Sequence, residues 1–223
     1  MSKSALVMFS GGQDSTTCLA VALSRHEHVE AVVFDYAQRH RIELSQAQKL
    51  ADLAGIQLTL VDLTVLSQLT PNALTRSDIP ITTDASGLPS TFVPGRNLVF
   101  LSFAGIVARQ KGIHTIYGGM CDTDFSGYPD CRDAFVKSMN QTLNLAMDEE
   151  FEIVTPLMNL TKAQTVQLMS ELGRIEWYAD THTCYEGRRP ACGVCPACEL
   201  RIKGFREAGI RDPLGYEIEV GWG

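Results

Sequence analysis

The stretch ALVMFSGGQDS, residues 5–15, decides how the N-terminal half of the chain folds. Its first five residues are apolar and end at two glycines, a pattern typical of a buried parallel strand. The polar residues after them open a helical pattern from about Gln13 to Ser24. Two glycines let the backbone turn tightly and approach an anion, and a helix start offers unpaired N–H groups and a positive dipole end. The stretch therefore predicts a phosphate-binding turn; the alternative is an ordinary glycine turn between strand and helix.

Outward from this turn, strand-like and helix-like segments alternate. Strands are expected at 5–9, 29–36, 56–61 and 114–117, and helices at 13–24, 39–54, 97–111, 131–147 and 161–172. Thr161 and Gln164 are placed to form a capping box, and the helix that they open is the last clear one. Residues 64–95 interrupt the alternation and are expected to form a long functional loop or lid. The order predicts an α/β fold, a Rossmann-like parallel sheet with helices on both faces.

The composition is that of an ordinary globular protein. The chain has 223 residues, of which 45% are hydrophobic and 20% charged, and this length suits one medium domain with a small appendage. The net charge of −7 argues against a large nucleic-acid surface. No apolar run approaches the roughly 20 residues of a membrane helix, and nothing near the N-terminus resembles a signal peptide. We therefore expect a cytoplasmic protein with reduced thiols and no membrane partner.

Four of the seven cysteines lie close together near the C-terminus. Their spacing is C-x7-C-x2-C-x2-C, formed by Cys184, Cys192, Cys195 and Cys198. Four thiolates suit tetrahedral zinc and leave no open coordination position, so a structural zinc site is expected. An iron–sulfur cluster and unligated core cysteines are the alternatives. We expect residues 176–223 to form a zinc-binding segment packed on a nucleotide-binding domain, residues 1–175.

The turn itself matches neither of two common nucleotide motifs. SGGQDS lacks the Lys-Ser/Thr pair of the Walker motif and the G-x-G-x-x-G spacing. It resembles the SGGxDS signature of the PP-loop ATP pyrophosphatases, in which the loop holds the β- and γ-phosphates while a substrate oxygen attacks the α-phosphorus. The resemblance implies ATP binding by the residues from the strand end into the helix, although Cys18 also suits core packing. These residues are Phe9, Ser10, Gly11, Gly12, Gln13, Asp14, Ser15, Thr16, Thr17, Cys18 and Leu19.

Five further stretches narrow the resemblance. They are FDYAQRH at 34–40, FVPGRN at 92–97, TDFSGYPDCR at 123–132, TPL at 155–157 followed by Lys162, and TCY at 183–185. Together with the phosphate loop they closely resemble the 7-cyano-7-deazaguanine synthases, from the loop to about Pro213. One position departs: Ala37 stands where that family usually has glycine, which concerns the local backbone conformation.

This resemblance implies a carbon–nitrogen ligase that uses ATP, Mg²⁺ and Zn²⁺. Its substrates are 7-carboxy-7-deazaguanine and ammonia. The carboxylate is adenylated, ammonia displaces AMP to give the amide, and a second ATP activates the amide oxygen so that the nitrile forms. Magnesium is expected to bridge the phosphates. The resemblance also implies a homodimer and no direct nucleic-acid partner.

Roles for single residues follow from chemistry. Lys162 is expected to neutralise phosphate charge, the alternative being a solvated lysine. Arg96 is expected to bind the substrate carboxylate or the phosphates, the alternative being an ion pair that anchors a loop. The guanine-like edge carries N–H donors and calls for a carboxylate, for which Asp122, Asp124 and Asp130 are the choices, although an aspartate in such a loop is often a turn former.

Other side chains have equally open assignments. Tyr128 could stack on the base or pack, and Arg39 and His40 could contact substrate or lie at a solvated helix start.

Three other functions are compatible with parts of the sequence. A tRNA thiolase is kept open by Cys121 and Cys131, two conceivable reactive thiols that flank a polar loop, but the net acidity and the lack of an RNA-binding appendage oppose it. Many amidotransferase relatives carry a separate glutaminase domain, for which this chain has no room after its ATP domain. A binding module with a vestigial loop is opposed by the intact SGGQDS.

Overall fold

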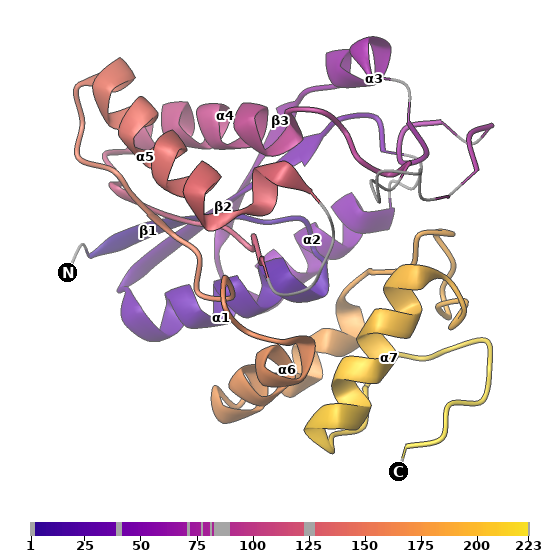
Figure 1. The fold of residues 1–223 in the computed structure, drawn as a ribbon. Helices are drawn as coiled ribbons and strands as arrows, with labels where there is room; N and C mark the ends of the chain where they lie inside the picture. Colours follow the sequence, from indigo (N-terminus) through magenta and orange to yellow (C-terminus); the bar gives the residue numbers. More distant parts are fainter. Residues whose placement is uncertain are drawn as a thin grey trace.

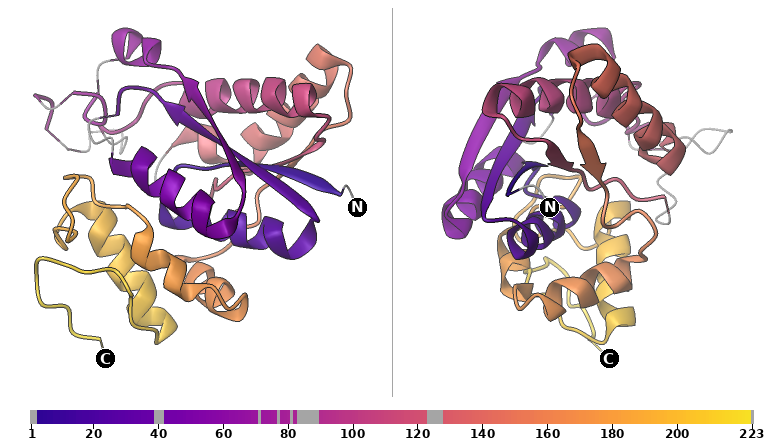
Figure 2. Two further views of the ribbon diagram at one scale, coloured as in Figure 1. Left: turned by 180° about the vertical axis from the view of Figure 1, so that it is seen from behind. Right: turned by 90° about the vertical axis from the view of Figure 1, so that its left-hand side faces the viewer.

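A five-stranded, all-parallel sheet forms the centre of the described part of the chain. The computed structural model describes residues 3–38, 42–70, 72–76, 78–80, 82, 90–122 and 128–222. The strand order is β3-β2-β1-β4-β5. Figures 1 and 2 show the sheet with helices on both sides of it. The strands are β1 (Ser4–Met8), β2 (His28–Asp35), β3 (Gln57–Asp62), β4 (Thr115–Tyr117) and β5 (Glu152–Val154). The predicted parallel sheet is confirmed.

Alternation along the strands divides the core into two layers. On β1, Leu6 and Met8 face a cluster that includes side chains of α4 (Arg96–Lys111) and α5 (Asp133–Met147). Ala5 and Val7 face the opposite cluster, which includes side chains of α1 (Gln13–Arg25) and α2 (Ile42–Ala54). Successive strand residues point to opposite faces, and both faces are covered, as in other parallel sheets. The prediction of helices on both faces is therefore confirmed.

The helices agree with the sequence analysis over most of the chain. They are α1 (Gln13–Arg25), α2 (Ile42–Ala54), α3 (Val65–Leu69), α4 (Arg96–Lys111), α5 (Asp133–Met147), α6 (Lys162–Glu171) and α7 (Pro196–Ala208), with 3₁₀ turns η1 (Pro129–Cys131) and η2 (Ile175–Asp180). The capping box at the start of α6 is confirmed: Thr161 Oγ1 accepts from Gln164 N, and Gln164 Oε1 accepts from Thr161 N.

Three elements were missed. The helix opened by Thr161 is not the last, because α7 follows the cysteine cluster. The strand β5 has only three residues, and α3 lies within the loop expected at 64–95. Much of that loop, including 83–89, lies outside the described residues. Its assignment as a lid stays a prediction.

Helix α7 and the turn η2 pack against α6 below the sheet layer, as the orange and yellow elements in Figures 1 and 2 show. A shared apolar cluster joins Ala20 of α1 and Val166 of α6 to Tyr178 of η2 and Phe205 of α7. The division of the chain at 175/176 stays a prediction, and this cluster crosses it. Among the described residues, no helix is long and apolar enough to cross a membrane.

Strand β1 lies where the strand order reverses, with β2 and β3 on one side of it and β4 and β5 on the other. It pairs with β2 on one side and with β4 on the other. In open α/β sheets, ligands bind beyond the carboxyl ends of the strands at such a switch point. The turn after β1 is the predicted phosphate loop, so the topology places it where a ligand is expected.

Candidate active site

The turn after β1 is held by its own serines. Ser15 Oγ accepts a hydrogen bond from Ser10 N at 3.2 Å and lies 3.1 Å from Ser10 Oγ. Ser15 Oγ also donates to the carbonyl of Gly12 at 3.1 Å, and Gly12 N donates to Ser10 Oγ at 3.3 Å. These bonds fix the loop before a ligand binds, which lowers the ordering cost of binding.

Gly11 has two independent reasons to be glycine. Its φ of 75° lies in the left-handed region, which residues with a Cβ adopt at a cost. A Cβ on Gly11 would also lie 2.8 Å from Ala47 N and 2.9 Å from Glu43 O, both in α2. The loop therefore bends sharply and lies directly against the first turns of α2.

The start of α1 carries an unused donor. Gly12 is the N-cap of α1, and no side chain caps the helix. Gln13 is buried, and its Nε2 has no hydrogen-bond partner among the described residues. A buried donor without a partner is costly, and the N-terminus of a helix favours anions. An open helix start beside an orphaned buried amide fits the phosphates of a nucleotide.

Lys162 is not a solvated lysine. Its Nζ lies 2.7 Å from both carboxylate oxygens of Asp14, across 148 positions of sequence. Only 12% of the Lys162 side chain is exposed. The start of α6 thus brings a cation to the phosphate loop, where the sequence analysis predicted one.

The other residues predicted to bind the nucleotide are all buried. Phe9, Cys18 and Leu19 are buried in the apolar cluster beneath the loop, so only their backbone groups are near the turn. Thr16 and Thr17 are fully buried and donate to the carbonyls of Gly12 and Gln13. Burial raises the pKa of the Cys18 thiol well above its usual range. These five side chains support the loop from below.

Arg96 lies in a half-buried aromatic cluster at the N-terminus of α4. Its guanidinium carbon lies 5.6 Å from the ring centre of Tyr128. Burial raises the pKa of Tyr36 to about 12, although the charge of Arg96 acts to lower it. The hydroxyl groups of Tyr128 and Thr91 are 2.6 Å apart. Burial also raises the pKa of the Tyr185 phenol, and Tyr128 is near enough to raise it further. A cation among tyrosines suits a planar ring that carries a negative charge.

The structure places the nominated aspartates in different surroundings. Asp130 is buried, and its Oδ2 accepts from Asn97 N at 2.9 Å while Asn97 Nδ2 donates to the Asp130 carbonyl. Its carboxylate thus caps the first turn of α4 beside Arg96. Asp122 is exposed. Asp124 lies outside the described residues, as do Arg39 and His40.

The sequence analysis missed Glu43, which opens α2 next to Gly11. Its side chain is half-buried. Burial raises the pKa of its carboxyl to about 7, although Arg96 acts in the opposite direction. The signal in the sequence was weak, since a glutamate in the first turn of a helix is ordinary.

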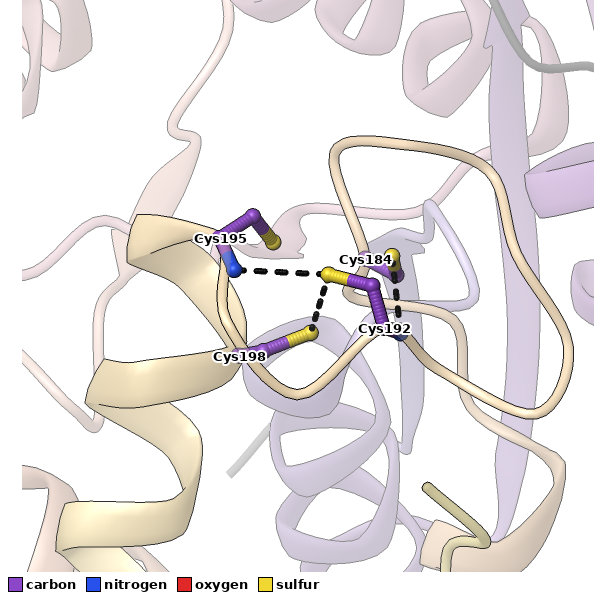
Figure 3. A group of neighbouring side chains, drawn as sticks. All are labelled: Cys184, Cys192, Cys195 and Cys198. Carbon is purple, nitrogen blue, oxygen red and sulfur yellow. Dashed lines mark hydrogen bonds between the residues drawn. The ribbon is translucent and has the colours of Figure 1, made fainter. Parts of the chain in front are cut away.

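The four cysteines converge as predicted. Their Sγ atoms all lie within 4.8 Å of one another and all four residues are buried. Figure 3 shows the four side chains gathered in one place. Cys192 Sγ and Cys198 Sγ are 3.9 Å apart, close to the roughly 3.8 Å that two thiolates span on a tetrahedral zinc with bonds of about 2.3 Å. Backbone N–H groups of Cys192 and Cys195 donate to sulfur at 3.5 and 3.3 Å.

The pKa values of the thiols in this cluster shift in opposite directions: burial raises that of Cys192, and the hydrogen bond with Cys195 raises that of Cys198, whereas that of Cys195 is lowered. A hydrogen bond from Cys198 lowers the pKa of Cys195 to about 5. Cys195 is also the N-cap of α7, whose dipole favours negative charge there. The donor set and the spacing fit one tetrahedral metal ion.

The segment around the cysteines is fastened to the phosphate loop. His182 N donates to the carbonyl of Gly11 at 2.9 Å. Tyr178 OH lies 2.6 Å from Thr17 Oγ1, which belongs to α1. Sequence reasoning found neither contact, because each joins residues more than 150 positions apart.

Arg201 of α7 is the buried centre of this connection. It donates to both carboxylate oxygens of Asp212, at 2.6 and 2.8 Å. It also donates to the hydroxyls of Thr181 and Thr183 and to the carbonyl of Tyr178. One guanidinium therefore orders the chain on both sides of His182.

Cys121 and Cys131 are engaged in hydrogen bonds of their own. Cys121 Sγ lies 3.4 Å from the carbonyl of Leu160, and Cys131 Sγ accepts from Asn97 Nδ2 at 3.3 Å.

A groove of about 1120 Å³ lies along α5 and β5, lined among others by Asn140 and Leu145. None of the residues nominated from the sequence lines it.

Comparison with known proteins gives a family match over most of the chain. The family described as "Queuosine biosynthesis protein QueC" matches residues 4–209. A protein of Lysinibacillus sphaericus (strain C3-41) named 7-cyano-7-deazaguanine synthase is 57% identical over 206 residues, 91% of this chain and 94% of its own. The protein of the same name from Bacillus subtilis (strain 168) is 57% identical over 205 residues, with the same coverage.

Among solved structures, a 4-thiouridine synthetase in complex with RNA and ATP has a similar fold. Its TM-score is 0.52 at 18% identity, covering 92% of this chain and 50% of that one. This chain thus spans half the length of that structure. The likeness concerns the fold alone.

Proposed function

This chain belongs to the QueC family of queuosine biosynthesis proteins, and on that premise we propose that it converts 7-carboxy-7-deazaguanine and ammonia to 7-cyano-7-deazaguanine with ATP. The name of relatives that are 57% identical over 91% of the chain supports the product. The observation that carries the ATP chemistry is the phosphate loop, with its open helix start and Lys162 bound to Asp14. A 4-thiouridine synthetase of similar fold has been solved with ATP bound.

Two activations are needed because neither a carboxylate nor an amide loses oxygen readily. In the first, a carboxylate oxygen attacks the α-phosphorus of ATP and pyrophosphate leaves. Ammonia then adds to the carboxyl carbon, AMP departs with one oxygen, and a proton is lost to give the amide. The amide oxygen attacks a second ATP in the same way. Departure of AMP and loss of the remaining N–H protons gives the nitrile.

The chain's own residues serve these steps by position and charge. The N–H groups at the start of α1 and the Nε2 of Gln13 are donors for the departing pyrophosphate. Lys162 supplies a positive charge at the same loop. Arg96 is our choice for the carboxylate of the substrate, with Tyr128 beneath the ring. Asp130 acts by capping the helix that carries Arg96.

Two metals complete the proposal. Asp14 is the carboxylate at the phosphate loop and would hold Mg²⁺ together with phosphate oxygens. The four cysteines would hold one Zn²⁺ in a structural role. Magnesium supplies charge neutralisation on the phosphates when it is bound.

Four further features stay proposals. We expect that ammonia is taken up free or is delivered by another protein, and that the protein is cytoplasmic. We also expect a homodimer, and light scattering of the purified protein would test this. The net charge of −7 supports the absence of a direct nucleic-acid partner.

The decisive experiment follows small molecules by mass spectrometry. Purified protein is incubated with 7-carboxy-7-deazaguanine labelled with ¹⁸O in its carboxyl group, ammonium, and Mg-ATP. The proposal expects the nitrile, pyrophosphate, and two AMP per nitrile, each carrying one labelled oxygen. β,γ-Imido-ATP should support turnover, whereas α,β-methylene-ATP should not.

Each other result has a definite meaning. ADP in place of AMP would overturn the attack on the α-phosphorus while keeping the substrate. No conversion by folded, metal-loaded protein would overturn the synthase assignment. Sulfur transfer to tRNA would then be the next activity to measure.

A further inference from the structure

A carboxylate that the proposed chemistry has not used lies beside the phosphate loop. Glu43 is in the first turn of α2, and its carbonyl oxygen lies 2.9 Å from where a Cβ on Gly11 would be. The side chain is half-buried, and its carboxylate makes no hydrogen bond within the described ranges of the chain. It is therefore an acceptor at the edge of the site for which the described residues supply no donor.

The neighbours of Glu43 are those of a ring-binding site. Arg96 and Tyr36 are close enough to interact electrostatically with its carboxyl. Tyr128, in turn, lies over Arg96 and stacks with Phe92 at a ring-centre distance of 5.6 Å. Segments from α2, from the end of β2 and from the start of α4 thus meet around one aromatic and charged cluster.

A carboxylate is costly in such a place. Burial opposes its ionisation, and Arg96 offsets this only in part, since the pKa remains raised to about 7. No direct ion pair joins Glu43 to a cation among the described residues. Buried charges are ordinarily paired or hydrogen-bonded, and perturbed carboxyls in a cleft often mark a functional site. A ligand that brings N–H donors would supply the missing partners.

We propose that Glu43 determines base specificity by accepting hydrogen bonds from the amino and imino N–H groups of the deazaguanine ring. This inference rests on the function proposed above. The ring has a carboxylate at one end and two adjacent N–H donors at the other, so its site needs a cation and an acceptor. Arg96 and Glu43 are such a pair, on two helices that meet at the carboxyl edge of the sheet.

One turn further along α2, Gln46 adds a second acceptor. Its Oε1 is buried and has no hydrogen-bond partner among the described residues. Residues three apart lie on one face of a helix. Glu43 and Gln46 therefore form an acceptor face on α2, as a donor-bearing ring edge requires.

The variant Glu43→Gln tests the role, because it keeps the shape and turns one acceptor into a donor. Asp52→Asn is the matched control: it makes the same charge change on the same helix at an exposed position, where Asp52 accepts from Gln48. Steady-state rates are measured with 7-carboxy-7-deazaguanine and with its analogue lacking the 2-amino group. The KM for ATP and the thermal midpoint are measured for every variant.

The expected result is a selective loss of base recognition. Glu43→Gln should raise the KM for 7-carboxy-7-deazaguanine at least tenfold and leave the KM for ATP within twofold. Wild type should prefer the 2-amino substrate at least tenfold, because a site built to accept N–H groups discriminates against a ring without them. Glu43→Gln should lose that preference, and its thermal midpoint should not fall.

The contrary results separate the two proposals. If wild type makes the nitrile while Glu43→Gln keeps its KM and its preference, Glu43 is not the reader and the synthase assignment stands. A rise in the KM for ATP alone would assign the carboxylate to adenine and overturn the inference. If wild type makes no nitrile, the proposed function fails and this inference falls with it.

Discussion

Gly204 of α7 offers a direct way to move Lys162, the lysine that contacts the phosphate loop. A Cβ at this position would lie 2.6 Å from Lys162 Cβ and 3.2 Å from its carbonyl carbon, whereas ordinary contact begins at 3.4 Å. Gly204→Ala therefore has to displace the start of α6 by about 0.8 Å, because these atoms belong to or adjoin the main chain. The two 2.7 Å contacts between Lys162 and Asp14 cannot survive that shift unchanged.

The magnitude follows from geometry. A misplacement of about 1 Å in a site can reduce the rate by about 100-fold, so we expect kcat/KM for ATP to fall by about 10- to 100-fold. Overpacking costs about 1–3 kcal/mol, and replacing glycine by alanine in a helix returns about 1 kcal/mol. The protein should therefore stay folded, and the loss should lie in catalysis rather than in the folded fraction.

The assay measures AMP and nitrile formation beside a thermal melt. Gly105→Ala is the control: it lies inside α4, and its Cβ would meet only the side-chain ends of Leu143 and Met147 at 3.3 Å. These ends can move, so activity should stay within about twofold. If Gly204→Ala is folded and as active as Gly105→Ala, the idea that α7 positions Lys162 is wrong.

Four other perturbations have expected outcomes. Lys162→Met should lower kcat/KM for ATP by about 100-fold, whereas Lys203→Met, at an exposed site on α7, should leave initial rates unchanged. Ala37→Gly should stabilise the fold by about 0.5 kcal/mol in urea unfolding, because Ala37 has a φ of 58° and the left-handed penalty of about 1 kcal/mol exceeds the entropy that glycine adds; lower stability would contradict this. Glu43 has a folded-state pKa of about 7 against an ordinary 4.5, so the folded state holds the extra proton and stability should fall as pH rises from about 4.5 to 7. Glu43→Gln should remove that decline, which urea titrations at pH 5 and pH 8 would measure. Elemental analysis should find one zinc ion per wild-type chain and none in Cys192→Ser, and the thermal midpoint of the variant should be lower.

The sheet and its first helices were predictable because local and global signals agree there. Residues 5–9 are apolar without a break, and both faces of β1 are buried. The strand β5 is a different case, since three residues carry too little pattern to distinguish a strand from a loop. Its partner β4 supplies the hydrogen bonds that define it, and pairing across 37 positions cannot be seen in a sequence window.

The sequence analysis missed helix α7 because several of its residues depart from an ordinary helical pattern. Its first turn holds Pro196 and Cys198, which indicate a metal loop, and Gly204 lowers the helix propensity of its interior. Arg201 occupies a buried position where an apolar residue is expected, because its guanidinium is satisfied by Asp212 and by the chain around His182. Contacts with segments that are distant in sequence account for these departures from the helical pattern.

The same contrast holds for the candidate site, where features contiguous in sequence were predicted and features that depend on packing were not. The phosphate loop and the cysteine cluster are contiguous in sequence, so spacing alone predicted them. Glu43 gained its interest only from its burial and its lack of a partner among the described residues, which depend on packing and not on residue type. Gln13 was nominated with the loop, but its role as an unpaired donor likewise emerged only from packing. Asp130 is the converse case. Its residue type made it a candidate for the guanine-like edge, and in the structure its carboxylate caps the start of α4.

The contacts of α7 connect the cysteine cluster with the phosphate loop. Cys195 begins the helix, Arg201 orders the chain around His182, and Gly204 lies against Lys162. His182 in turn bonds the carbonyl of Gly11. A metal ion that fixes the start of α7 would therefore fix, through one rigid helix, both the lysine and the loop that act on phosphate. Loss of the ion should raise the KM for ATP before it unfolds the sheet, because β1 to β5 are joined by hydrogen bonds that do not involve this segment.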